Sequence, residues 1–291
     1  MVLAALAGME SRTVDVGQLT LAYQAAGEST SPALVLLHGW PHSSAVYEGV
    51  MDKLGETHRV LAFDLPGVGA SRGTPRSAEK THLAEVILEG AHKAGARSIV
   101  IAGFDVGGMI AFAAARDHAS LITGAIVGHT VIPGIDPWSQ VIADPRIWHF
   151  ALHAVEKLPE TLVTGRERPY FDFFFDVLAK NPRSLDEKLR RRLTEAYERP
   201  ESLRAGFDWY RAFPKDAERN AVRKTIDVPL LYLRGDAYGR IQDYVNGLRR
   251  AGAERLESGT IAGSGEYLPV EAPDAFVEHV RRFAQGLATL H

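Results

Sequence analysis

A glycine-rich turn that holds a single aspartate carries the strongest chemical signal in this sequence. The turn, Gly103-Phe-Asp-Val-Gly-Gly108, follows a β-branched apolar run at 98–102 and precedes a helical stretch of small residues. This context is typical of a nucleophile elbow, which holds a side chain on a sharp turn above a sheet. Asp105 stands at the apex, where a carboxylate attacks carbon and forms an ester, which favours alkyl over acyl chemistry. An ordinary glycine-rich strand-to-helix turn has the same short pattern, so the interpretation depends on other segments.

Three other segments predict strands whose ends could surround this aspartate. A buried strand ends in His38-Gly-Trp-Pro41, a second strand at about 59–64 has a glycine-rich exit, and a late strand from Val228 ends in Asp236. Together these segments resemble the α/β-hydrolase superfamily over nearly the whole chain. Because Asp105 stands at the elbow, the sequence is most similar to the branch of the epoxide hydrolases and haloalkane-type dehalogenases.

The resemblance implies an α/β-hydrolase fold, with a mostly parallel sheet, helices on both faces and a helical cap insertion. The residues support the same α/β class, because continuous apolar strands alternating with helices are typical of a parallel sheet that is buried on both faces. These strands are expected at about 33–38, 59–64, 98–103 and 122–128.

The pattern changes after the fourth of these strands. From 133 to 223 no strand signal appears, and aromatic residues and prolines cluster instead. We therefore assign 1–132 and 224–291 to the hydrolase-like core and 133–223 to the cap. An aromatic-rich cap predicts a largely apolar pocket, although most of these rings could simply form the core of the cap itself.

Local patterns predict three further elements of the core. Residues 12–24 alternate polar and apolar side chains, which indicates an opening β-hairpin. A helix is expected at about 78–94 with Ser77 as its N-cap, and a last helix from Ala272 presents an apolar stripe to the sheet.

The resemblance also assigns roles around Asp105. The backbone N–H groups of Trp40 and Val106 would form the oxyanion hole, and the peptide bond before Pro41 is usually cis in this family. His38 belongs to the turn motif and is expected to be structural. Asp236 matches the acid that orients a histidine base, whereas Gly-Asp is also ordinary turn chemistry.

The histidine base itself is absent. The family's pattern around it matches Gly263-Ser-Gly-Glu-Tyr267, in which Glu266 occupies the histidine position. His279, on the last helix, and His291, at the chain end, are not expected to substitute for it. Glu266 is expected to pair with Asp236, so that the two carboxylates share a proton and one pKa rises. A carboxylate with a raised pKa can still act as a general acid or base.

Two cap segments and the residue before the nucleophile complete the expected site. Tyr210 matches a cap donor to the epoxide oxygen or leaving group, and either Trp148 or His149 matches the other. Phe104 stands where this branch usually has histidine, and with Trp40 it is expected to contact the substrate.

The substrate class follows from two absences. Related fluoroacetate dehalogenases grip a carboxylate with arginines where this chain has Val106 and Met109. An apolar small molecule is therefore expected. The leading hypothesis is an epoxide-hydrolase-like enzyme that opens an epoxide or displaces a leaving group through an ester on Asp105. The alternatives are a non-hydrolytic isomerase or cyclase of specialised metabolism, and a catalytically inactive ligand-binding protein.

Composition limits the remaining classes. The chain of 291 residues has a formal net charge of −3 and no cysteine, so neither nucleic acid nor an anionic membrane is an expected partner, and disulfides are excluded. We expect no metal or other cofactor, a monomer or homodimer, and a cytoplasmic location. The apolar start lacks a basic region and is short for a signal peptide, and Met9 is an alternative initiator to Met1.

Overall fold

The continuous apolar runs of the sequence form the inner strands of one sheet. The computed structural model describes residues 10–28, 32–237 and 239–288. Its 8-stranded sheet has the order β1-β2-β4-β3-β5-β6-β7-β8. Pairing is antiparallel from β1 through β2 to β4 and parallel from β4 onward. The strands are β1 (Glu10–Val16), β2 (Leu19–Ala26), β3 (Ala33–Leu37), β4 (Val60–Phe63), β5 (Ile99–Phe104), β6 (Gly124–Gly128), β7 (Leu230–Gly235) and β8 (Leu256–Ile261).

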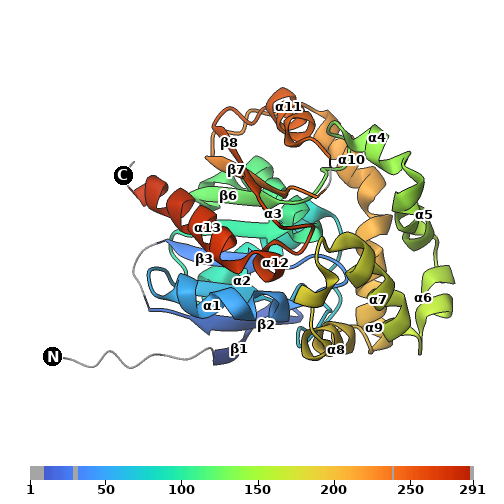
Figure 1. The fold of residues 1–291 in the computed structure, drawn as a ribbon. Coiled ribbons are helices and arrows are strands. Elements are labelled where there is room, and N and C mark those ends of the chain that lie inside the picture. Colours follow the sequence, from blue (N-terminus) through green and yellow to red (C-terminus); the bar gives the residue numbers. More distant parts are fainter. Residues whose placement is uncertain (1–9, 29–31, 238, 289–291) are drawn as a thin grey trace.

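Helices cover both faces of this sheet and also gather beyond one of its ends (Figure 1). Those that accompany the sheet are α1 (Glu48–Gly55), α2 (Lys80–Lys93), α3 (Val106–Asp117), α11 (Ile241–Ala251), α12 (Leu268–Glu271) and α13 (Pro273–Ala288). Helices α1 and α13 pack together, and α2 packs on α3, which contacts β5 and β6. The expected fold class, a mostly parallel sheet with helices on both faces, is therefore confirmed.

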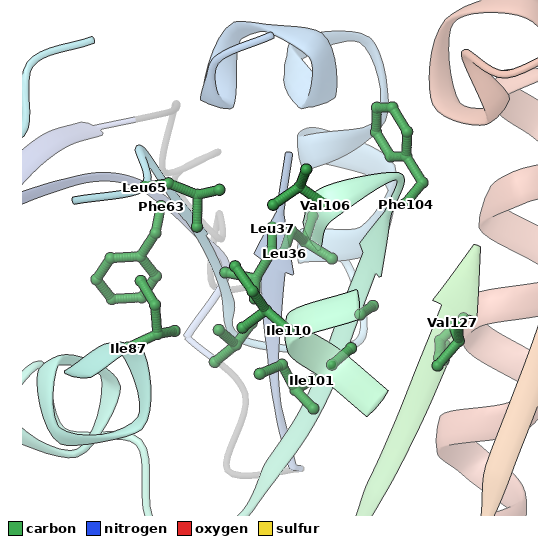
Figure 2. Packing of buried hydrophobic residues seen from close by; sticks show 14 of the residues in the cluster. Leu36, Leu37, Phe63, Leu65, Ile87, Ile101, Phe104, Val106, Ile110 and Val127 are labelled. Carbon is green, nitrogen blue, oxygen red and sulfur yellow. The ribbon is translucent and has the colours of Figure 1, made fainter. Parts of the chain in front are cut away.

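The core lies where α3 crosses the central strands. Figure 2 shows Ile110 of α3 close to Leu36 of β3 and Ile101 of β5, and all three side chains are fully buried. Ile87 of α2 lies beside Phe63 of β4 in the same view. Because both faces of the inner strands are covered, nearly every residue in them is apolar. This packing fixes the carboxyl end of β5, where the glycine-rich turn begins.

The stretch between β6 and β7 consists of helices joined by loops, and it forms the cluster beyond the end of the sheet (Figure 1). Its helices are α4 (Trp138–Ile142), α5 (Trp148–Ala154), α6 (Leu158–Val163), α7 (Glu167–Leu178), α8 (Glu187–Glu195), α9 (Pro200–Arg211) and α10 (Phe213–Ala221). We call this cluster the cap. A buried ion pair joins it to the core, because Lys80 Nζ of α2 lies 2.7 Å from Asp216 Oδ2 of α10.

Several local expectations differ from the structure in detail. The helix expected at 78–94 begins at Lys80, and its N-cap is Glu79 rather than Ser77. The hydroxyl of Ser77 instead accepts a hydrogen bond from the Glu79 N–H at 3.1 Å, which forms a turn just before the helix. Both candidate initiators, Met1 and Met9, and also His291, lie outside the described residues. Among the described helices none is long and apolar enough to cross a membrane.

Candidate active site

The turn after β5 holds Asp105 in a strained conformation above the sheet. Asp105 precedes α3 and has φ 52° and ψ −129°, a region that L-residues with a side chain rarely adopt. The turn is also too tight for a side chain at Gly107, where a Cβ would lie 2.3 Å from the Leu37 carbonyl oxygen. Strain of this kind persists only when the surrounding structure imposes it. The elbow geometry therefore fixes the position of the carboxylate.

Backbone donors hold this carboxylate from two sides. The Trp40 N–H donates to Asp105 Oδ1 at 2.7 Å, and the Val106 N–H also hydrogen-bonds the carboxylate. A Cβ at Gly39 would lie 2.4 Å from Asp105 Oδ1, so only glycine allows this approach. The Trp40–Pro41 peptide bond is cis. Two N–H groups thus converge on one carboxylate, as an oxyanion hole requires.

Burial controls the charge of Asp105. Loss of solvent raises its pKa to about 6, although the two N–H groups and the charge of Lys80 act in the opposite direction. The carboxylate is therefore largely ionised at neutral pH and becomes protonated in mild acid. An ionised, poorly solvated carboxylate on a fixed backbone is suited to nucleophilic attack.

His38 has the structural role that the sequence indicates. Its Nε2 accepts a hydrogen bond from the Leu65 N–H at 2.9 Å, and its Nδ1 lies 2.8 Å from the Gly39 carbonyl oxygen. Since Nε2 accepts, the proton is on Nδ1 and is donated to that carbonyl. The neutral ring therefore braces the loop after β3.

Glu266 lies in the loop after β8 and faces the same cavity as Asp105. Glu271 fixes this loop, because its Oε2 accepts hydrogen bonds from the Gly265 and Tyr267 N–H groups at 2.9 and 3.1 Å. Burial and the charge of Asp105 raise the pKa of Glu266 well above its ordinary value, while Arg234 opposes the shift. Glu266 therefore keeps its proton more readily than an ordinary glutamate does, and the charge of Asp105 adds to this effect.

The expected pairing of Asp236 with Glu266 is wrong. Asp236 is exposed, forms an ion pair with Lys180 Nζ at 2.6 Å, and accepts a hydrogen bond from the Gly263 N–H at 3.1 Å. These contacts lower the pKa of Asp236 and hold its carboxylate at the surface, away from the cavity. The carboxylate that acts on Glu266 is instead Asp105, whose charge raises the pKa of Glu266. The coupled carboxylates therefore belong to the nucleophile and the loop after β8.

A cavity of about 540 Å³ lies between the sheet ends and the cap. Tyr210 of α9 lines it, and burial followed by the charges of Asp105 and Glu266 keeps the pKa of this phenol well above its ordinary value. Tyr210 is therefore a hydrogen-bond donor there. The other lining residues include Trp40, Met109, Thr130, Val131, Val141, Ile147, Phe150, Phe173, Val177, Leu178 and Tyr244.

The two cap candidates that the sequence did not separate both line the cavity, in different ways. His149 is buried, and burial lowers its pKa to about 3, so its ring is neutral. It stacks on the Trp40 indole, with ring centroids 6.2 Å apart and an interplanar angle of 15°. Trp148 is 42% exposed and lies at the cavity rim. His149 and Trp40 thus form an inner wall, whereas Trp148 borders the entrance.

Phe104 does not contact this cavity, contrary to the expectation of a substrate contact. Its ring packs against His42 and Tyr47, with centroids 5.2 and 5.9 Å away, and Figure 2 shows it apart from Ile101 and Ile110. Successive side chains of a strand point to opposite sides. The residue before the nucleophile therefore belongs to the hydrophobic core.

Sequence reasoning missed several polar lining residues, among them Arg234 and His129. Arg234, on β7, and His129, directly after β6, both line the cavity and are buried. An arginine inside an otherwise apolar run, Val228-Pro-Leu-Leu-Tyr-Leu-Arg234, is unusual for a strand that is buried on both faces. This unusual position could have indicated from the sequence that Arg234 belongs to the site.

Comparison with known proteins identifies the family of this chain. Residues 32–236 match the family described as alpha/beta hydrolase fold. The chain belongs to this family. An aspartate at the elbow of this hydrolase fold, with two backbone N–H groups on its carboxylate, agrees with the resemblance to the epoxide hydrolase branch, and the relatives described next include a member of that branch.

The relatives of this hydrolase-fold protein include epoxide hydrolases and an esterase. It is 26% identical to the soluble epoxide hydrolase of Corynebacterium sp. (strain C12) over 261 residues, which is 86% of this chain and 89% of the relative. It is also 26% identical to the pimeloyl-[acyl-carrier protein] methyl ester esterase of Yersinia enterocolitica, over 87% of this chain and 93% of that protein.

Solved structures show the same fold over nearly the full length. The crystal structure of Cfl2 from Burkholderia cenocepacia has a TM-score of 0.87 and 30% identity, covering 96% of this chain and 97% of Cfl2. The epoxide hydrolase CorEH has a TM-score of 0.85 and 23% identity, covering 96% of this chain and 99% of CorEH. At that identity the likeness to CorEH concerns the fold alone.

Proposed function

We propose that this protein opens an epoxide on a largely apolar small molecule by attack of Asp105 and then hydrolyses the resulting ester. The observation that carries the proposal is that Asp105 and Glu266 line one cavity, where burial and the charge of Asp105 raise the pKa of Glu266. Family membership and the epoxide hydrolase relatives support a hydrolase. The same nucleophile could also displace a leaving group from carbon.

Epoxide opening consumes the proton of Glu266. A carboxylate oxygen of Asp105 attacks an epoxide carbon, the carbon–oxygen bond of the ring breaks, and an alkoxide forms. Tyr210 donates a hydrogen bond to that oxygen, and Glu266 transfers its proton to it. The products of this step are a hydroxyalkyl ester on Asp105 and an ionised Glu266. A carboxylic acid can serve here because the alkoxide is a far stronger base than a carboxylate.

Ester hydrolysis then returns the proton. Ionised Glu266 takes a proton from a water molecule, whose oxygen attacks the carbonyl carbon of the ester. The Trp40 and Val106 N–H groups stabilise the oxyanion of the tetrahedral intermediate. Its collapse releases the diol and an ionised Asp105 and leaves Glu266 protonated, so the site returns to its starting state. One carboxyl group can thus act as acid and then as base.

Isotope labelling provides the direct test. A panel of aryl epoxides is incubated with excess enzyme in ¹⁸O-water, and the peptide that contains Asp105 is examined by mass spectrometry. Attack by Asp105 followed by hydrolysis at its carbonyl carbon places ¹⁸O in the Asp105 carboxylate. Diol release without label in this peptide would contradict a nucleophilic role.

The products distinguish the alternative functions. A carbonyl compound or cyclic ether in place of the diol would favour an isomerase or cyclase. Ligand binding without adduct or product over the whole panel would favour a binding protein. An Asp105→Asn variant serves as the control, because it should bind the epoxides but take up no label.

A further inference from the structure

The end of α9 that carries Tyr210 is tied to the core by a lysine. Trp209, the residue before Tyr210, accepts a hydrogen bond on its backbone carbonyl oxygen from Lys80 Nζ of α2 at 2.6 Å. Carbonyl groups in the last turn of a helix have no N–H partner farther along that helix, so a donor from another element can satisfy them. A cation is also favoured at this end of a helix. The contact therefore joins the backbone next to Tyr210 to the sheet side of the molecule.

The ammonium of Lys80 is enclosed at this point. The side chains of Lys80 and Asp216 are each 3% exposed, and Nζ lies 2.7 Å from Asp216 Oδ2. The other carboxylate oxygen, Oδ1, accepts a hydrogen bond from the backbone N–H of Lys80 at 2.9 Å, at the first residue of α2. Breaking a charge pair that is removed from solvent is strongly unfavourable. The position of Nζ is therefore fixed relative to both α2 and α10.

A second contact of the ammonium leads to the ring of Tyr210. Lys80 Nζ lies 4.7 Å from the centroid of the Phe213 ring, an arrangement that attracts a cation to an aromatic face. The Phe213 ring packs in turn against the Tyr210 ring, with centroids 5.1 Å apart. Tyr210 lines the cavity, whereas Lys80 is absent from the described residues that line it. Lys80 thus contacts the surroundings of Tyr210 on two sides without reaching the substrate space.

The opposite end of α9 has a link to the core that lacks these contacts. Ser202 is fully buried, and its Oγ donates a hydrogen bond to the Gly67 carbonyl oxygen at 2.7 Å. Ser202 precedes Tyr210 by roughly two helical turns, which is about 12 Å along the axis. Both links hold α9 on the core, but only the one from Lys80 lies beside the phenol. Ser202 therefore provides a matched control.

We infer that Lys80 is a positioning residue, which orients the phenol of Tyr210 toward the substrate oxygen through the Trp209 carbonyl and the Phe213 ring. The inference rests on the proposed function, in which Tyr210 donates a hydrogen bond to the oxygen of the opening epoxide. Catalytic groups must be held within about 0.5 Å of their productive position by the residues that support them. Lys80 supplies this support from the core and takes no part in proton transfer.

The test removes the contact without leaving a buried charge. In Lys80→Met/Asp216→Asn both charges are replaced by neutral groups of similar size, and the asparagine can still accept a hydrogen bond from the first N–H of α2. The single-turnover rate of ester formation is measured at pH 8, well above the Asp105 pKa of about 6. The rate should fall about 10- to 100-fold, as expected for a misplaced catalytic group. Ser202→Ala should change it by less than about twofold.

A double-mutant cycle distinguishes positioning from general support of the fold. In a Tyr210→Phe protein the phenolic hydroxyl is already absent, so the paired change at 80 and 216 should lower the rate by less than about a further twofold. Losses that multiply in full would overturn the inference, and so would equal losses from the paired change and from Ser202→Ala. Circular dichroism checks the folding of each variant. If the paired variant does not fold, Lys80→Gln replaces it, because its neutral side chain is one atom shorter.

A non-reactive probe separates this inference from the proposed function. Benzonitrile has an aryl ring and a hydrogen-bond acceptor but no epoxide, and its infrared nitrile band shifts when the nitrogen accepts a hydrogen bond. The band of the bound probe should differ between the wild type and Tyr210→Phe. The paired variant should resemble Tyr210→Phe, and Ser202→Ala should resemble the wild type.

Two results with this probe contradict a positioning role: a wild-type band in the paired variant, or a band that Tyr210→Phe leaves unchanged. The expected pattern of bands without any diol from epoxides would contradict the proposed function alone. Diol formation with a contradictory pattern of bands would contradict only the role of Lys80. The two proposals can therefore fail separately.

Discussion

The elbow and the loops that follow β7 and β8 hold their acidic groups by different means. At the elbow, backbone N–H groups fix Asp105, and the absence of a Cβ at Gly39 makes their approach possible. In the two loops side chains take a larger part, since Lys180 pairs with Asp236 beside the Gly263 N–H, and Glu271 braces the segment that carries Glu266. A backbone site depends on local sequence, whereas a side-chain site depends on residues that packing brings from elsewhere.

This difference explains how one site tolerates an exchange of histidine for glutamate. The elbow keeps its geometry whatever stands after β8, because its hydrogen bonds come from Trp40 and Val106. A second ionised carboxylate near Asp105 would be costly, and this cost raises the pKa of Glu266. The exchange therefore changes which group in the cavity can give or take a proton, and it leaves the nucleophile in place.

The largest expected effect is on turnover, and it should differ between variants of the two loop carboxylates, Glu266 and Asp236. Glu266→Gln should lower diol formation by about 10²–10⁴-fold, because the ester loses its general base. The ester on Asp105 should accumulate, visible as an adduct in the intact mass. Asp236→Asn is the matched control, since its carboxylate is outside the cavity, and turnover should change by less than about threefold. Equal losses in both variants would show that Asp236 takes part in the reaction.

The second effect concerns the pH dependence of ester formation. Attack requires ionised Asp105, so with a pKa of about 6 the single-turnover rate should fall about tenfold from pH 8 to pH 5. On the basic side the rate should fall again as Glu266 loses its proton, above its ordinary titration range. Stopped-flow mixing with an aryl epoxide measures both limbs. An acid limb at about pH 4 would show that burial does not control the nucleophile.

Sequence patterns were sufficient for the elbow, the backbone donors and the strands other than β8, which was not among the strands expected. The apolar runs and the glycines at 39, 103 and 107 each have a local cause, and the strand ends lie within one or two residues of those expected. The resemblance also located Tyr210 and Glu266, which line the cavity. These features depend on the backbone or on positions that a motif fixes.

The errors concern side-chain direction and partners. Phe104 is adjacent to the nucleophile in sequence, but the alternation of the strand turns its ring into the core. Asp236 follows a buried strand as expected, but Lys180, just after α7 of the cap, forms an ion pair with it. Arg234 is buried against the ring of Tyr244, which comes from the next helix, α11. Each of these contacts joins segments that no short motif contains.

The third effect is on the free energy of unfolding, and it tests whether the elbow is a strained site. The folded-state pKa of Asp105 is raised to about 6 from 3.8, so its favourable contribution is complete below about pH 4 and is lost as the pH rises through 6. At pH 8 the ionised carboxylate should cost about 2–3 kcal/mol of unfolding free energy. Asp105→Asn should therefore be the more stable protein at pH 8, with the difference vanishing near pH 4. Urea unfolding at both pH values measures this, and a pH-independent difference would contradict the linkage.

The smallest effect should come from the ion pair that holds Asp236 at the surface. Lys180→Met removes a contact in which both side chains are substantially exposed, 41% for Lys180 and 35% for Asp236. Solvent screens such pairs, so the midpoint of thermal unfolding should shift by less than about 2 °C. Turnover should also change by less than about twofold, because Glu266 acts without Asp236. A large gain in turnover would mean that the released Asp236 carboxylate reaches the cavity, and the contrast between the two loops would then be a consequence of Lys180 alone. A large loss would instead identify Lys180 as part of the site.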